Sequence, residues 1–397
     1  MTNRVYLDYA ATSPLLPEVR RALDSFFDSS AHDVGVQANA NSLHSDGRKA
    51  FAALEDARTR IAQVLKVRPH ELVFTGCATE SSNTTLTGLV FESLQKKESL
   101  PHIVTSTIEH EATFATVQLL EKLGFCQVSY VAPNRAGFVE LDAVKQAVQS
   151  NTILVSLIMA HNETGAINDV ASIGSYLAEH GVLFHIDAVQ ALGKIPLNLG
   201  SLPVDLASFS AHKIGGPKGV GLLYIKNGIR IVPLLNGGGQ ESGLRSGTQN
   251  VAGAAAFATA CETVCGDALS LEAEMQRLRE LRDYLYEQLC SYPQVHATVP
   301  CEKGSETYLP NIVTVCIEGI ESESLILQLD LQGFSVSGGS ACGTHSLKPS
   351  RTLLELGIDP DLAQGLLRVS LGLNTNKDDL ERFMITFESI LSSLSTQ

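Results

Sequence analysis

The chain has 397 residues, of which 44% are hydrophobic and 18% charged, a balance typical of a globular protein with room for more than one domain. Its formal net charge of −14 argues against nucleic acid as a main partner, because phosphate backbones bind to basic surfaces. No apolar run approaches the roughly 20 residues of a membrane span, and the first residues lack the apolar core of a signal peptide. We therefore expect no membrane partner and a cytoplasmic location.

The eight cysteines show neither a C-x-x-C pair nor the regular spacing of a structural metal site. We expect reduced thiols, as in a cytosol-like compartment, and no metal ion. Most of these cysteines are expected to be core residues.

The first part of the chain is predicted to be an extended segment followed by helices over Pro17–Phe27 and Ser45–Leu65, the latter with clear amphipathic spacing. Short apolar strands and helical patterns then alternate. The expected strands are 71–75, 103–106, 127–131, 153–159, 183–186, 206–209 and 221–225. The expected helices between them are 79–95, 111–123, 141–149 and 170–180. This alternation predicts an α/β fold with a mostly parallel sheet flanked by helices.

The last third of the chain has a different pattern. A glycine turn at 237–239 precedes a long helical region expected from Val251 to Cys290. Strand patterns at 312–317, 335–337 and 367–370 then predict a second, smaller α/β unit, with a boundary near residue 265.

The stretch Ser208–Gly219 places Lys213 just after a short apolar strand and before a loop of glycines and a proline. Open α/β sheets bind ligands at the carboxyl ends of their strands. A lysine there suits Schiff-base chemistry, because desolvation and neighbouring cations lower the pKa of its ammonium group. An ordinary exposed loop lysine is the alternative, and it is the better interpretation of any lysine considered alone.

A second strand, Leu183–Asp187, ends in a carboxylate and is followed by Gln190. Asp187 alone would more readily be a helix cap, but beside a Schiff-base lysine it suits pairing with the pyridine nitrogen of pyridoxal phosphate. The segment Thr75–Ser81 passes from a strand into a helix, so its backbone N–H groups and the hydroxyl of Thr79 suit a phosphate. A plain helix start is the alternative.

Three further residues stand out. His110 follows a strand and could stack on a cofactor ring, although a surface or core histidine is the more common case. Cys342 lies in the run of small residues Ser335–Gly343, where a thiol can reach a substrate; an incidental exposed cysteine is the alternative. Arg368 interrupts a strand-like run and suits bidentate capture of a substrate carboxylate, with a structural ion pair as the default.

Together these motifs resemble the cysteine desulfurase family, pyridoxal-phosphate enzymes of the class V aminotransferase group. The resemblance extends over almost the whole chain. The segments that carry it are 6–12 (Tyr-Leu-Asp-Tyr-Ala-Ala-Thr), 41–44 (Asn-Ser-Leu-His), 78–81 (Ala-Thr-Glu-Ser), 109–110 (Glu-His), 161–165 (His-Asn-Glu-Thr-Gly), 185–190 (His-Ile-Asp-Ala-Val-Gln), 210–213 (Ser-Ala-His-Lys), 245–248 (Arg-Ser-Gly-Thr), 339–342 (Gly-Ser-Ala-Cys) and 368–370 (Arg-Val-Ser).

The resemblance implies a role for each matching residue toward pyridoxal 5'-phosphate. Lys213 would hold the cofactor as a Schiff base and shuttle the Cα proton, while His110 would stack on the ring and assist that proton transfer. Asp187 would pair with the pyridine nitrogen and Gln190 with the ring hydroxyl. The residues expected at the phosphate are Ala78, Thr79, Ser210, His212 and, from the neighbouring subunit of a homodimer, Thr248.

The implied substrate is L-cysteine, whose carboxylate Asn162 and Arg368 would orient. The thiolate of Cys342 would attack the substrate sulfur, leaving L-alanine and a persulfide for a sulfur-acceptor or scaffold protein of iron–sulfur cluster or thiocofactor assembly. The implied fold is the type I fold of pyridoxal-phosphate enzymes. Its large domain would span 17–265, and its small domain would combine 1–16 with 266–397, bringing both termini together.

Other functions stay open at this point. A selenocysteine lyase could keep the loop around Cys342, whereas a cystine C–S lyase or a small-substrate transaminase needs no thiol there. A non-catalytic scaffold of the same fold has no need for Lys213, Asp187 and Cys342 together. The sequence leaves undetermined the sulfur acceptor and the preference between cysteine and selenocysteine.

Overall fold

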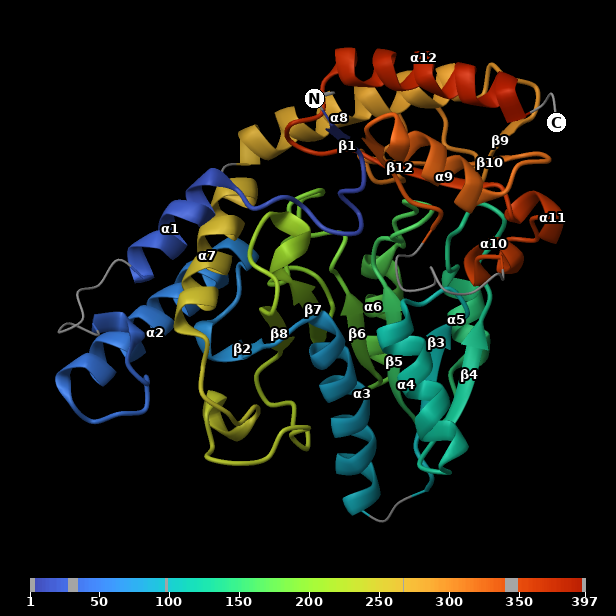
Figure 1. Cartoon of the computed structure of the whole chain (residues 1–397). Helices are drawn as coiled ribbons and strands as arrows, with labels where there is room; N and C mark the ends of the chain where they lie inside the picture. The colour runs from blue at the N-terminus through green and yellow to red at the C-terminus, as the bar shows by residue number, and fades with distance from the viewer. Residues whose placement is uncertain (1–3, 28–34, 97–98, 267, 340–348, 395–397) are drawn as a thin grey trace.

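The main sheet is mostly parallel, as the sequence predicts. The computed structural model describes residues 4–27, 35–96, 99–266, 268–339 and 349–394. In these ranges seven strands follow the order β2-β8-β7-β6-β5-β3-β4 (Figure 1). Only β8 is antiparallel to its neighbours, β2 and β7. The strands are β2 (Leu72–Thr75), β3 (His102–Ser106), β4 (Gln127–Val131), β5 (Thr152–Ile158), β6 (Leu183–Asp187), β7 (Leu206–Ser210) and β8 (Gly221–Ile225).

Helices cover both faces of this sheet, which is why β2, β3, β7 and β8 are buried along their whole length. On one face, α3 (Ala78–Gln95) and α4 (Glu111–Lys122) bury Leu86 and Leu120 against Ile103 and other strand residues. Figure 1 shows these two helices in front of the sheet. The helices that pack into the core on the other face are α2 (Ser45–Leu65), α6 (Val170–Glu179) and α7 (Val251–Cys265).

The larger part contains further helices, and their buried residues Val19, Val144 and Ala211 belong to the same core. These helices are α1 (Pro17–Phe27), α5 (Leu141–Ala147) and the short 3-10 helices η1 (Gly35–Gln37), η2 (Pro69–Glu71), η3 (Ala211–Ile214) and η4 (Glu241–Gly243). The bounds of α1 and α2 match the predicted helices. None of the helices in the described ranges combines the length and the apolar character that a membrane crossing needs.

A smaller part of the molecule has its own sheets and core. Strand β10 lies between β12 and β9 and is antiparallel to both, and β1 pairs with β11 in parallel. Val5 near the start of the chain and Leu391 near its end share one core. Figure 1 shows β1 and α12, which carry them, in the same part of the molecule. The elements are β1 (Val5–Tyr6), α8 (Ala268–Leu289), β9 (Val295–Ala297), β10 (Ile312–Ile317), α9 (Ser322–Leu331), β11 (Phe334–Ser335), α10 (Arg351–Glu355), α11 (Pro360–Ala363), β12 (Leu366–Ser370) and α12 (Lys377–Leu394).

The long helical region expected from Val251 to Cys290 consists of two helices, since α7 ends at Cys265 and α8 begins at Ala268. Helix α8 then contributes to two cores. Its first half packs Leu271 against the core of the main sheet, and its second half packs Leu285 into the core of the smaller part. The division at residue 265 therefore remains a prediction.

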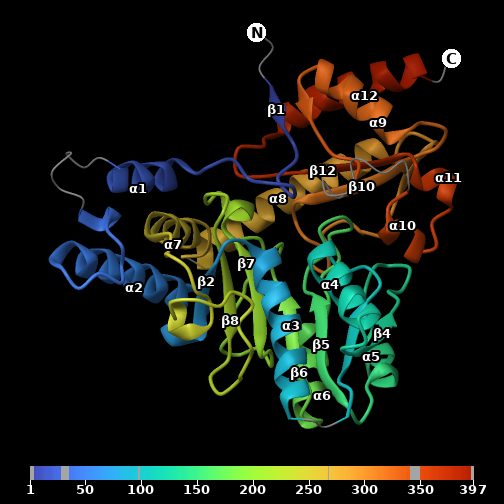
Figure 2. The ribbon, with the colours of Figure 1, turned by 60° about the horizontal axis from the view of Figure 1, so that its bottom comes forward.

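The segment after β1 links the two parts. Main-chain hydrogen bonds join Ser13 N to the His212 carbonyl (2.9 Å) and Leu16 N to the Gly215 carbonyl (3.0 Å). Figure 2 shows this segment running from β1 to α1. Residues from the start of the chain thereby reach the loop after β7.

Candidate active site

Most of the predicted site residues lie at the same edge of the main sheet. Strands β2, β3, β5, β6 and β7 all run in one direction, so their carboxyl ends meet there. The residues at or just after these ends are, in strand order, Ala78, His110, Asn162, Asp187 and Ser210. The topology therefore gathers five segments that are far apart in the sequence.

Lys213 lies on η3, directly after β7, and is partly buried. Its Nζ donates hydrogen bonds to the carbonyl oxygens of Ala10 (2.7 Å) and Ala11 (2.8 Å). Ser13 Oγ donates to the carbonyl of Lys213 itself (2.9 Å). The segment after β1 thus holds both the main chain and the amine of this lysine.

Asp187 is the last residue of β6, next to β7 in the sheet, and only 5% of it is exposed. Its Oδ1 accepts a hydrogen bond from Val189 N (3.0 Å). Burial raises the pKa of Asp187, while the charges of His110 and Lys213 lower it. A buried carboxylate of this kind is stabilised when a cation lies beside it.

Gln190 is buried and joins two lysines through one network. Its Nε2 donates to the carbonyl of Ala10 (2.9 Å), which also accepts from Lys213, and its Oε1 accepts from Lys194 Nζ (2.6 Å). Burial, together with the charges of Lys213 and Arg368, lowers the pKa of Lys194 to about 7. The sequence interpretation missed Lys194, although its spacing of four residues from Gln190 is a signal that could have found it.

The amino end of α3 lies against β8, which follows the lysine-bearing loop. Cys77 precedes the helix and makes no side-chain capping bond. Gly221 allows the close approach, because a Cβ there would lie 2.5 Å from the carbonyl carbon of Cys77. Gly221 is also the register partner of Ser210. The first turn of α3, with Ala78 and Thr79, therefore lies beside the end of β7. A phosphate site that used residues from both α3 and the loop after β7 requires this arrangement.

His212 and Ser210 flank this position from the side of η3. His212 Nδ1 lies 3.1 Å from Thr12 Oγ1. Burial lowers the pKa of His212 to about 4, and nearby lysines contribute in the same direction. The ring is therefore neutral at pH 7. Ser210 is 4% exposed and is the buried residue before η3.

Arg368 on β12 is 1% exposed and makes contacts from the smaller part of the molecule. It donates from Nη2 to Asp8 Oδ1 (2.9 Å) and from Nη1 to the carbonyl of Asn162 (3.0 Å). Its Nε has no hydrogen-bond partner among the described residues. Arg368 thus contacts the main chain of Asn162 and the side chain of Asp8, to which the sequence interpretation assigned no role.

His110 is the N-cap residue of α4, and its Nδ1 accepts a hydrogen bond from Ala112 N (3.1 Å). In the neutral ring the proton is then on Nε2. The preceding residue, Glu109, is buried; its Oε1 accepts from Ser106 Oγ (2.5 Å) and Ile158 N (2.9 Å). Burial raises the pKa of Glu109 to about 8. Glu109 was not among the predicted site residues.

Two predicted residues are not brought into this cluster by the described chain. Thr248 is exposed, on the loop that follows η4. Cys342 lies outside the described residues. Glu163 lies near Gly339 and Ser350, which are described residues before and after Cys342 in the chain. Its Oε2 accepts a hydrogen bond from Ser350 Oγ (2.6 Å). A Cβ built on Gly339 would lie 3.5 Å from the same oxygen.

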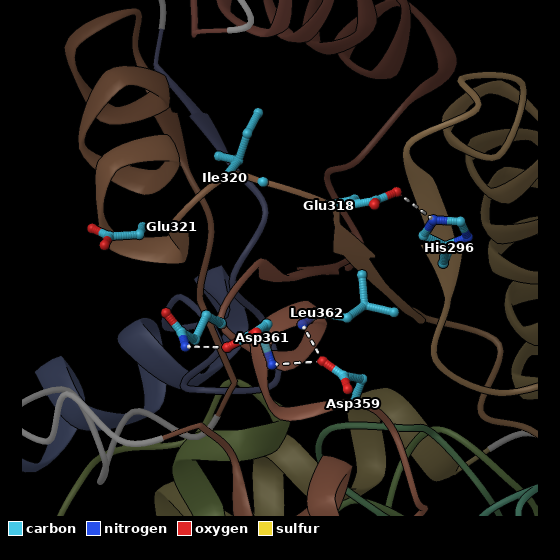
Figure 3. Close-up of a pocket in the computed structure, with 9 residues that line it drawn as sticks. His296, Glu318, Ile320, Glu321, Asp359, Asp361 and Leu362 are labelled. Atoms are coloured by element: carbon cyan, nitrogen blue, oxygen red, sulfur yellow. Dashed lines mark hydrogen bonds and ion pairs between the residues drawn. The ribbon is translucent and has the colours of Figure 1, made fainter. Parts of the chain in front are cut away.

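A hollow of about 570 Å³ lies elsewhere, in the smaller part (Figure 3). Asp359 caps α11 at its edge, accepting from Asp361 N (2.9 Å), and His296 lies 3.7 Å from Glu318. The acidic residues that line it are Glu318, Glu321, Asp359 and Asp361. These carboxylates repel phosphate and carboxylate ligands, so this hollow does not suit the ligands that the sequence predicts.

Comparisons with known proteins agree with the geometry. A family described as aminotransferase class-V matches residues 5–383. Cysteine desulfurase IscS of Dictyoglomus turgidum is 40% identical over 396 residues, covering 100% of this chain and 96% of the relative. Cysteine desulfurase IscS of Klebsiella pneumoniae is 40% identical over 384 residues, covering 95% and 90%.

Solved structures give the same result. A NifS-like protein superposes with a TM-score of 0.88 at 37% identity, covering 98% of this chain and 99% of that one. The NifS-like protein from Rickettsia africae gives a TM-score of 0.84 at 29% identity, covering 98% and 100%. The family and the fold that the sequence predicts are thereby confirmed. The chain belongs to the cysteine desulfurases of the aminotransferase class-V family.

Proposed function

We propose that this protein is a pyridoxal-phosphate-dependent cysteine desulfurase that converts L-cysteine to L-alanine and collects the sulfur on Cys342. The observation that carries the proposal is the placement of Lys213 and the buried Asp187 at the ends of two paired strands, β7 and β6. The relatives that match the whole chain are named cysteine desulfurases, which supports the same activity.

The donor set fits pyridoxal phosphate. The first turn of α3 offers backbone N–H groups after a residue without a capping side chain, and Gly221 lets the start of this helix lie close to β8. The buried Nε of Arg368 lacks an acceptor among the described residues, as suits the carboxylate of an amino-acid substrate bound beside the cofactor. The residues proposed to hold the phosphate are Ala78, Thr79, Ser210, His212 and Thr248 of the partner subunit. When bound, the cofactor supplies a ring that delocalises negative charge from the substrate Cα.

Each remaining residue has a defined task in this proposal. Asp187 provides a buried carboxylate that holds a proton on the ring nitrogen, and Gln190 donates its amide to the ring hydroxyl. Lys213 binds the cofactor covalently and moves the proton at the substrate Cα. His110 presents its ring to the cofactor, with its orientation fixed by the hydrogen bond from Ala112 N.

Substrate binding is proposed for Arg368 and Asn162. The guanidinium of Arg368 already bridges Asp8 and the main chain of Asn162, so its fork is held in place before a substrate carboxylate arrives. Asp8 offsets part of the charge of this buried arginine, and Arg368 in turn lowers the pKa of Asp8 against the effect of burial.

Sulfur transfer would then balance without an external oxidant. The thiolate of Cys342 attacks the substrate sulfur, so that an S–S bond forms while the Cβ–S bond breaks. The electron pair of the broken bond stays with the substrate carbon, which takes up a proton and becomes the methyl group of L-alanine. The persulfide on Cys342 is the product that a sulfur-acceptor or scaffold protein would receive.

A homodimer is part of the proposal, because Thr248 is exposed in the single chain and would complete the phosphate site of the partner subunit. A cytoplasmic location is proposed as well. The seven cysteines that the structure describes are free thiols, which suits a reducing compartment.

The test is the release of sulfide and alanine from L-cysteine with excess thiol reductant. We expect equal amounts of both products from the parent protein and neither from Cys342→Ala, with cofactor absorbance retained in the variant. Lys213→Ala should lose the Schiff-base absorbance as well as activity. A Cys342→Ala variant that keeps its rate on cysteine would replace the desulfurase proposal with a C–S lyase. A parallel assay with L-selenocysteine separates a selenocysteine lyase, which would turn over selenocysteine alone.

A further inference from the structure

Arg351 makes an unusual set of contacts for a residue that none of the motifs includes. It is the first residue of α10, in the smaller part of the molecule, yet its side chain binds the segment between β3 and α4. It donates from Nη1 to the carbonyl of Thr107 and from Nη2 to the carbonyl of Glu109 (2.7 Å). These two carbonyls precede His110.

The same guanidinium holds the residues that follow His110. Nη2 pairs with the carboxylate of Glu111 (2.8 Å), and the guanidinium carbon lies 3.5 Å from the centre of the Phe114 ring, on the first turn of α4. An arginine can combine such a ring contact with hydrogen bonds from both Nη atoms, whereas a lysine has a single ammonium group. Arg351 therefore contacts the chain on both sides of His110.

We propose that Arg351 is a positioning residue that fixes His110 for its work on the cofactor, and this inference rests on the proposed function. The imidazole accepts a hydrogen bond from Ala112 N within its own helix. That bond orients the ring relative to α4, but it does not fix where the amino end of α4 lies relative to the strand ends. Glu109 ties this segment to Ile158 N of β5, and Asn83 of α3 donates to the carbonyl of Ala112. The fork of Arg351 adds a constraint from the smaller part of the molecule, because it binds carbonyls before the helix and a ring inside it.

The proposal predicts how strongly each of four variants lowers kcat. Arg351→Met removes all four contacts and should lower kcat about tenfold to a hundredfold, the cost of a misplaced acid–base group. Arg351→Lys keeps the charge but loses the fork and the stacking, and should fall in between. Phe114→Leu removes the stacking surface alone and should have a small effect of the same kind. Glu355→Gln, an exposed change on α10, is the matched control and should leave kcat unchanged.

A double-mutant cycle with His110→Ala separates positioning from a general structural role. If Arg351 acts through His110, adding Arg351→Met to the His110→Ala variant should lower kcat by no more than about twofold. An equal loss of rate in both backgrounds would overturn the proposal. KM for L-cysteine should change little in Arg351→Met, since the substrate carboxylate is bound elsewhere.

A second readout needs no activity. In the cofactor-free protein, the rate at which diethyl pyrocarbonate modifies His110 is followed by mass spectrometry, with the exposed His70 as internal reference. Arg351→Met and Arg351→Lys should raise the rate at His110 several-fold and leave His70 unchanged; an unchanged rate at His110 in both would contradict the inference. If the parent protein lacks desulfurase activity altogether, the proposed function fails while this measurement still decides whether Arg351 positions His110.

Discussion

Lys194 Nζ donates a 2.6 Å hydrogen bond to Gln190 Oε1, and both side chains are buried beside the segment that holds Lys213. The bond fixes the amide of Gln190 with its NH2 group toward the carbonyl of Ala10. A lysine in the interior is thus used to orient a neutral side chain in the proposed cofactor site. Burial of this amine also makes the stability of the protein depend on pH.

The pKa of Lys194 is lowered to about 7 in the folded protein, whereas an unfolded lysine titrates near pH 10.4. Between these values the unfolded chain binds more protons, so this residue makes the free energy of unfolding rise with pH. Relative to Lys194→Met, the cofactor-free parent should gain up to about 1.4 kcal/mol per pH unit between pH 7 and 10. Urea unfolding at pH 7, 8 and 9 measures this difference. The exposed Lys122→Met should show no such change, and parallel curves for parent and Lys194→Met would contradict the prediction.

Glu109 should act in the opposite direction. Its pKa is raised from 4.5 to about 8, so between these values the folded protein holds a proton that the unfolded chain has lost. Its contribution to stability is full below pH 4.5 and declines as the pH rises to 8. Glu109→Gln, which keeps an acceptor for Ser106 and Ile158 N, should therefore become more stable than the parent by up to about 1.4 kcal/mol per pH unit across this range. Equal pH slopes in chemical unfolding of the two proteins would show that Glu109 is ionised in the fold. Glu355→Gln serves as the exposed control.

A buried ion pair holds the loop that leads to Thr248. Arg58 donates to both carboxylate oxygens of Glu241 (2.7 and 2.9 Å), and their side chains are 8% and 1% exposed. Arg58→Met leaves Glu241 without its buried partner and should lower the free energy of unfolding by about 3–5 kcal/mol. The double variant Arg58→Met with Glu241→Gln should recover part of that loss, because no buried charge is left alone. Denaturant midpoints of the three proteins test this, and additive losses would refute it.

Gly221→Ala should separate cofactor binding from stability. The new methyl group would lie 2.5 Å from the Cys77 carbonyl carbon and would push the start of α3 away from β8. Loss of one hydrogen bond to a charged group costs about 1.5–3 kcal/mol, so affinity for pyridoxal phosphate should fall about tenfold or more.

Gly88→Ala is the matched control for this change. Gly88 is also on α3 but lies far along the helix from its first turn. A Cβ on Gly88 would lie 2.6 Å from the Val232 carbonyl oxygen. It should destabilise the protein while leaving cofactor affinity nearly unchanged. Equal affinities in the two variants, measured by absorbance titration, would argue against a phosphate site at the start of α3.

The sequence predicts the parts of the site that depend on local pattern. Asp187 and Lys213 each follow an apolar strand, and parallel strands end at one edge, so their proximity follows from the alternation of elements. The bounds of α1 and α2 could be read from Pro17 and from apolar spacing. Resemblance to a known family then supplied the roles.

Other features depend on contacts that no local pattern encodes. The use of the Ala10 carbonyl by Lys213 needs a main-chain oxygen about 200 residues away, and a carbonyl has no sequence signature. Arg351 looks like any exposed arginine until the fold places it against Phe114. Strand β9 is three residues long, with two of them exposed, so it lacks the apolar run that marks a strand.

The ion pair between Asp8 and Arg368 joins residues that are 360 positions apart. A ribosome that adds about 5–20 residues per second needs roughly 20–70 s to pass from one to the other. Throughout that interval the main sheet can assemble, yet the proposed substrate anchor does not exist. The enzyme therefore becomes competent only near the end of its own synthesis, so unfinished chains cannot bind cysteine through this anchor.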